Sequence, residues 1–167
     1  MSNLIYLITS LPSLSFGQPP PLSFDQFYLD AKEQLSNKDF ETLHKIDLQL
    51  FDPEKFSALK EFFPYMEALK WEMNNLREAR KNDRTPTLLS LPKNMLDQNP
   101  LEREKTIMKW QWDLLSDLDM TDPFSLKVVF VYKLKLQILH RLHSFNPSKG
   151  LEILEVVVNP PKKEKEI

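Results

Sequence analysis

Three polar side chains fall inside apolar helical stripes, where their chemistry would be charge pairing or hydrogen bonding within a protein interior. Glu104 and Gln111 are bracketed by leucine, isoleucine and methionine, near the middle of a buried arc. Lys135 lies on the line through Val131 and Leu139 in the next predicted helix. Because a lone buried charge costs several kcal/mol, we expect Lys135 to meet Glu104 or Gln111. The alternative is that Lys135 extends its stem to solvent.

Other residues that could do chemistry have simpler structural explanations. His140 and His143 have a spacing that could serve a metal, but no third ligand accompanies them, and histidines near a helix C-terminus are favoured by the helix dipole. With Gly17 and Gly150 as the only glycines, a phosphate-cradling loop of the Walker or Rossmann type is excluded. The sequence therefore predicts no catalytic residue, no cofactor and no metal, and the chain is not expected to be an enzyme.

Composition indicates one ordinary globular domain. The chain has 167 residues, 41% hydrophobic and 28% charged, which is typical of a self-sufficient core; we assign residues 1–161 to a single helical domain and 162–167 to a disordered charged tail. A net charge of -2 argues against nucleic acid as a partner. The lack of cysteine fits a reducing compartment, so we expect a cytoplasmic protein.

The N-terminal apolar run, Leu4 to Ile8, is not interpreted as a targeting segment. A secretory leader begins with basic residues, whereas the first Lys or Arg here is Lys32. Thr9, Ser10 and Pro12 also end the run well short of the roughly 20 residues that cross a bilayer, so no direct membrane span is expected. The composition of the run predicts a short extended segment instead.

Helix start signals recur along the rest of the chain. Serine caps predict helices from Ser23 and Ser36, and a cap followed by proline predicts further starts at residues 52–53, 99–100 and 122–123. The predicted helices cover residues 52–81, 100–119 and 123–144, with a kink or break at Pro64, a loop over 82–98 and a short terminal helix around Leu151 and Leu154. The expected fold is all-α, with five to six helices in an elongated bundle and one short N-terminal extended segment.

Two sets of side chains are candidate protein contacts. Trp110 and Trp112 differ by about 200° around a helix, so the helix must be covered on two sides, by another helix of this domain or by a partner protein. The basic residues of the third predicted long helix form a candidate docking face, or else a solvated surface. They are Lys70, Arg77, Arg80 and Lys81.

Several segments, in order along nearly the whole chain, resemble one protein family. They are residues 4–12, 20–23, 99–105, 112–113, 134–139 and 149–152. The similarity is to an uncharacterised bacterial family of chlamydiae, spirochaetes and Bacteroidetes. Its members are encoded among the genes of a V-type ATPase, and the family resembles a shortened, helical counterpart of the stalk component that joins the rotor shaft of that machine to its membrane ring.

The resemblance implies a non-catalytic subunit or accessory protein of a rotary, ion-translocating ATPase. Its partners would be the other subunits, and it would be cytoplasmic, with attachment to the inner face of the membrane through those partners as a further option. The first alternative is a free-standing helical scaffold or assembly factor. The second is an enzyme whose site sequence does not reveal, for which a solvent-open pocket lined by Glu104, Gln111, Lys135 and His140 would speak.

Overall fold

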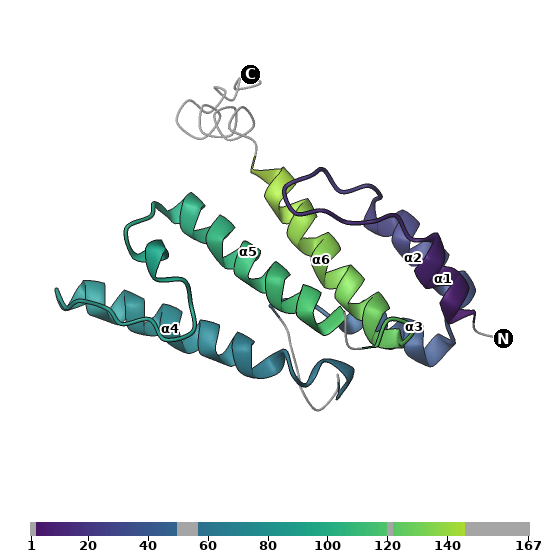
Figure 1. The fold of residues 1–167 in the computed structure, drawn as a ribbon, viewed down its shortest axis with the longest axis horizontal. Helices are drawn as coiled ribbons and strands as arrows, with labels where there is room; N and C mark the ends of the chain where they lie inside the picture. Colours follow the sequence, from purple (N-terminus) through teal and green to yellow (C-terminus); the bar gives the residue numbers. More distant parts are fainter. Residues whose placement is uncertain (1–2, 50–56, 120–121, 146–167) are drawn as a thin grey trace, which may run out of the picture.

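The computed structural model describes residues 3–49, 57–119 and 122–145, and within these ranges the chain is an all-α bundle without strands. Helices α4, α5 and α6 follow one another across the molecule, and α1 and α2 lie beyond α6 (Figure 1). The predicted terminal helix and the tail 162–167 lie outside the described residues. The α-helices are α1 (Leu4–Ser10), α2 (Phe24–Gln34), α3 (Asn37–Lys45), α4 (Phe63–Lys81), α5 (Pro100–Asp119) and α6 (Leu126–Ser144); the 3-10 turns are η1 (Ser57–Leu59) and η2 (Lys93–Leu96).

Helix α6 is the centre of the bundle, because apolar side chains cover most of its circumference. It packs against α5 on one side and against α1, α3 and η1 on others. A helix enclosed in this way needs apolar residues all round rather than a single stripe. Its buried residues are Val129, Phe130, Val131, Lys133, Leu134, Leu136, Ile138 and Leu139.

The predicted start signals are confirmed where the structure describes them. Ser23 Oγ accepts the N–H of Gln26 at 3.2 Å and Ser36 Oγ accepts that of Asp39 at 3.2 Å, while Asn99 Oδ1 accepts the N–H of Glu102 at 2.9 Å. These bonds satisfy donors that a helix start leaves unpaired. The predicted start at 122–123 differs slightly: a turn precedes α6, which begins at Leu126.

The prediction of an N-terminal extended segment is wrong, since residues 4–10 form the helix α1. Asn3 Oδ1 caps it by accepting the N–H of Tyr6 at 3.2 Å, and Leu7 is fully buried. An extended segment would need a neighbouring strand for its backbone groups, and the described residues offer none. The segment therefore satisfies its own hydrogen bonds as a helix and packs Leu4, Leu7 and Ile8 on the core.

Pro64 marks a break, as predicted, because α4 begins at Phe63 and not earlier. The proline stands in the first turn of α4, where the N–H that it lacks would have no helical partner. The start predicted at residues 52–53 lies outside the described residues. Within the predicted loop over residues 82–98, η2 adds one short turn, whose Met95 is fully buried.

A buried lysine fastens the end of α3 to α6. The Lys133 ammonium, 2% exposed as a residue, donates to the carbonyl oxygens of Leu43 at 2.8 Å, His44 at 3.0 Å and Ile46 at 2.5 Å. It also lies over the ring of Tyr28, 5.5 Å from the centroid. A helix C-terminus leaves carbonyls without partners and carries partial negative charge, so one cation satisfies both needs.

This arrangement gives the fold a pH dependence with a defined sign. Burial lowers the pKa of Lys133 to about 8, although the Asp47 carboxylate acts in the opposite direction. Between pH 8 and the ordinary lysine pKa, the unfolded chain binds more protons at this site than the folded chain. The free energy of unfolding should therefore rise with pH from 8 towards about 10. Above that, burial of Tyr132 and Tyr28, which raises the pKa of both phenols, opposes the trend.

Urea denaturation at several pH values between 7 and 10 measures this effect. Asp47→Asn removes the charge that opposes the shift, so the rise should begin at lower pH in that variant. An unfolding free energy that falls over this range in the wild-type chain would contradict the expectation.

Candidate protein-contact site

The three predicted pairing residues each have a partner, but the structure gives them other partners than predicted. Lys135 Nζ lies 3.1 Å from Asp119 Oδ2, and 5.5 Å from the centroid of a tryptophan ring, that of Trp112. Glu104 is half-exposed and accepts from Arg141 at 2.8 Å. Among the described residues no contact joins Lys135 to Glu104 or Gln111. Ion pairs at two different heights thus join helices α5 and α6.

Gln111 is buried, as its position in the stripe indicated, and its Nε2 lies 3.4 Å from Met66 Sδ on α4. With Glu104 it lines a cavity of about 510 Å³ between α4, α5 and α6. Lys135 and His140 do not line this cavity. His140 instead contacts the carbonyl oxygen of Leu22 at 3.1 Å. The pocket that would have favoured an enzyme is therefore not assembled from the four residues named for it.

Trp110 and Trp112 are both covered by this chain. Trp112 is 7% exposed and meets Phe16 edge to face, with ring centroids 5.6 Å apart. Trp110 is half-buried on the opposite side of α5, where Tyr65 of α4 approaches it edge to face at 6.3 Å. Two different layers of the bundle thus supply the two covering surfaces, and neither tryptophan presents most of its ring to solvent.

Among the basic residues of α4, the outward ones make at most local contacts within the described part of the chain. Lys70 pairs with Glu67 at 3.4 Å, and Arg77 donates to Asn74 at 3.1 Å. Lys81 is exposed near the end of the helix. Such exposed contacts contribute little to folding stability, so these cations remain available to another molecule.

Two buried charges hold the segment after α4 against that helix. Glu72 is 1% exposed, and its carboxylate accepts the backbone N–H groups of Leu89 at 3.1 Å, Ser90 at 2.7 Å and Leu91 at 3.2 Å. Three donors on one carboxylate form a compact anion-binding turn. The segment that follows α4 therefore runs back along it and cannot swing freely.

The second buried charge is Arg103 on α5, which is 9% exposed. Its Nε donates to the carbonyl of Met95 at 3.1 Å and its Nη2 to that of Gln98 at 2.9 Å. Arg80 on α4 adds a bond to the carbonyl of Leu96 at 3.3 Å. Together these guanidinium groups fix η2 between α4 and α5, and they close a small second core made of Leu88, Leu91 and Met95.

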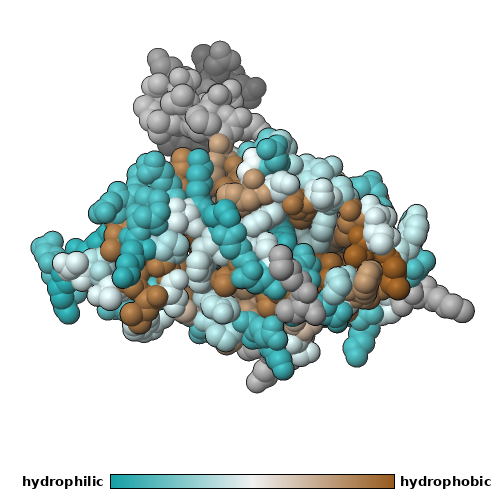
Figure 2. Space-filling model, viewed as in Figure 1, coloured by the Kyte–Doolittle hydropathy of each residue, from teal (hydrophilic) through white to brown (hydrophobic). Residues whose placement is uncertain are grey.

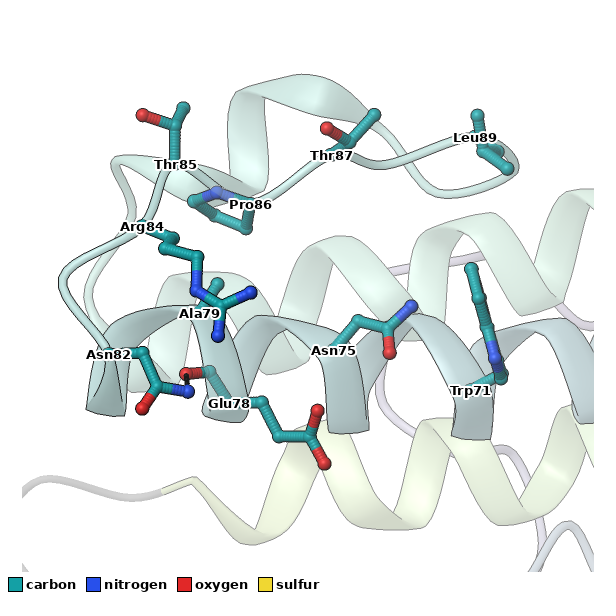
Figure 3. Close-up of a pocket in the computed structure, with 10 residues that line it drawn as sticks. All are labelled: Trp71, Asn75, Glu78, Ala79, Asn82, Arg84, Thr85, Pro86, Thr87 and Leu89. Carbon is teal, nitrogen blue, oxygen red and sulfur yellow. Dashed lines mark hydrogen bonds between the residues drawn. The ribbon is translucent and has the colours of Figure 1, made fainter.

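Holding the segment in this way creates a groove on the outer side of α4. Figure 3 shows Trp71, Asn75, Glu78 and Asn82 along the helix, with residues 84–89 running above them, and the cavity between measures about 410 Å³. At one end Trp71 is 56% exposed and Leu89 is 77% exposed. Large apolar side chains held open to solvent on a fixed backbone suit contact with another protein.

The surface elsewhere is mixed. In the view of Figure 2 hydrophilic residues predominate, and hydrophobic ones are interspersed, including a patch over α1 at the right. Ile5 and Tyr6 of α1 are 59% and 57% exposed, so α1 is a second apolar surface for comparison. Within the described ranges, no three His, Asp or Glu side chains are grouped to hold a metal ion, and no helix has the length and apolar content to cross a bilayer.

Sequence reasoning places the basic residues of α4 but misses Trp71, which lies between them. The prevalence of buried aromatic residues assigns Trp71 to the core, whereas the structure exposes it. Its position directly before the acidic Glu72 is informative, because neighbouring helix positions are about 100° apart, so the burial of Glu72 turns Trp71 towards the edge. Leu89 carries no usable pattern, since its exposure follows from the backbone bonds to Glu72.

Comparison of the chain with protein-family models, with curated proteins and with solved structures gave no match.

Proposed function

We propose that this chain is a non-catalytic subunit or accessory protein of a V-type ATPase, a stalk adaptor that works by presenting helix faces to other subunits. The resemblance of its segments to proteins encoded with that machine supports the choice of partner. The observation that carries the adaptor role is the groove on α4, where Trp71 and Leu89 are exposed at 56% and 77%.

The interior charges support a structural role for this chain's polar side chains. Glu72, Arg103 and Lys133 are buried ionisable groups of the described ranges, and each binds backbone atoms. A group already held by two or three backbone partners is a poor acid, base or nucleophile, since reaction would break the bonds that order the fold. Catalysis would then reside in the nucleotide-binding subunits of the assembly.

Around the groove, the flanking cations suit an acidic partner surface. Lys70, Arg77 and Lys81 border the outer face of α4 next to Trp71. An apolar anchor with a charged rim is the usual arrangement at protein interfaces, where the anchor supplies affinity and the rim guides encounter. The partner surface is therefore expected to combine an apolar side chain with surrounding Asp or Glu.

Affinity purification from cells that also express the ATPase subunits tests this proposal. We expect the tagged full-length chain to recover the ATPase subunits in fixed ratio, as measured by mass spectrometry. Trp71→Ser with Leu89→Ser should lower recovery at least about fivefold, because anchor residues carry much of an interface's energy. Tyr6→Ser, at a residue of similar exposure on α1, is the matched control and should leave recovery unchanged.

Other outcomes lead to other conclusions. Variable, substoichiometric recovery would favour the transient assembly factor over a stable subunit. Loss of recovery with Tyr6→Ser alone would move the contact surface to α1. Failure to recover any ATPase subunit would overturn the proposed partnership.

A further inference from the structure

A third cavity, of about 400 Å³, opens between α4 and the first turns of α5, and arginine side chains dominate its lining. Arg77 and Arg80 reach it from α4, one turn apart, and Arg103 reaches it from α5. Pro100, in the first turn of α5, also lines it. Met73 and Ile107 contribute apolar surface. The cavity thus has a cationic side and an apolar side.

The positive charge in this cavity has no carboxylate to balance it. Among the described residues, no ion pair involves Arg77, Arg80 or Arg103. Glu104 lines the same cavity, but its carboxylate is bound by Arg141, whose Nη2 lies 2.8 Å away. Three guanidinium charges therefore converge beside an acid whose charge is already neutralised.

The arginines keep hydrogen-bonding capacity beyond their present contacts. Each guanidinium has five N–H donors. Arg103 spends its Nε and Nη2 on two carbonyls, while Arg80 and Arg77 each make one bond, to Leu96 and Asn74. Burial, and then the charge of Arg80, lower the pKa of Arg103, so the charge that acts on it is another cation.

We propose that this cavity binds a small organic phosphate, with its phosphoryl group among Arg77, Arg80 and Arg103. Guanidinium groups match the oxygens of phosphate in shape and charge, and three of them complement a dianion better than a single carboxylate. The N-terminus of α5 adds favourable partial charge. The cavity is much larger than a bare phosphate ion, and Met73 and Ile107 would cover an apolar part of the ligand.

The proposal is independent of the ATPase partnership, because it requires only the cavity and its charge. It also differs from nucleotide binding by a glycine-rich loop, which this sequence excludes. Here side chains, rather than backbone amides, would hold the anion.

Titration calorimetry of the full-length chain, at fixed ionic strength, tests the site with phenyl phosphate, inorganic phosphate and pyrophosphate. We expect saturable binding of phenyl phosphate, at least about tenfold tighter than inorganic phosphate, because the ring gains the apolar wall. Arg77→Gln should weaken phenyl phosphate binding about tenfold, since it removes a charged donor but only one local bond to Asn74. Arg80→Gln should act in the same direction.

Lys38→Gln, which removes an exposed positive charge from α3, is the control and should leave binding unchanged. Thermal denaturation of each variant checks that the fold is retained. Absence of saturable binding of all three compounds would overturn the proposal, as would equal weakening by Lys38→Gln. Binding of a glutamate-rich peptide, but of none of the phosphates, would overturn it in favour of an acidic protein ligand.

Discussion

Replacing Lys133 with methionine is expected to lower the free energy of unfolding by about 3 kcal/mol at pH 7. Methionine fills similar space but cannot donate to the carbonyls of Leu43, His44 and Ile46, which the ammonium binds. Unsatisfied buried polar groups cost about 1–3 kcal/mol each, and the energy regained by not burying a charge offsets part of the loss. Urea denaturation followed by circular dichroism measures the change.

Lys135→Met is the matched control, because it lies on the same helix and changes the same side-chain type. Lys135 makes a single ion pair with a partly exposed Asp119 and leaves no backbone group unpaired when it is removed. A loss of about 1 kcal/mol or less is expected. Equal losses in the two variants would show that binding of the α3 carbonyls is not what Lys133 contributes.

Replacing Glu72 with glutamine should release the segment after α4 and lower the free energy of unfolding by about 2 kcal/mol. The amide keeps one acceptor oxygen, so it cannot serve the N–H groups of Leu89, Ser90 and Leu91 together. The released segment should also be cut faster by trypsin after Arg84, which is exposed. Limited proteolysis with mass spectrometry identifies that cleavage, and urea denaturation gives the stability.

Glu78→Gln provides the comparison for this experiment, because Glu78 is an exposed residue on the same helix. Its stability and its rate of cleavage should match those of the wild-type chain. If Glu72→Gln behaved the same way, the three short N–H contacts would not hold the segment in solution.

Local signals in the sequence were sufficient for most helix boundaries. Ser23, Ser36 and Asn99 each combine a capping side chain with an apolar stripe, and the helices begin where those residues indicate. Pro64 also acted through a purely local effect, the lack of an N–H. Residues 4–10 show the limit of such reasoning, because their β-branched and aromatic content suggested extension while the described part of the bundle offers them no strand to pair with.

The partners of the charged residues were harder to predict. Periodicity placed Gln111 and Lys135 on inward-facing lines, but it does not give the height at which two helices meet, so Lys135 reaches Asp119 instead of Glu104. Glu72, Arg103 and Lys133 were missed for another reason. Their partners are main-chain atoms, which every residue possesses, so no pattern of side chains along the sequence could reveal those contacts.

This use of main-chain atoms has a consequence for how much amino-acid substitution the loops can absorb over evolutionary time. The turn around Ser90 is recognised through amide hydrogens alone, so any residue that retains that hydrogen keeps the bond, and proline is the exception. The turn held by Arg103 is recognised through carbonyl oxygens, which proline also has. Two descendants of this chain could thus diverge widely in both turns while following the same path.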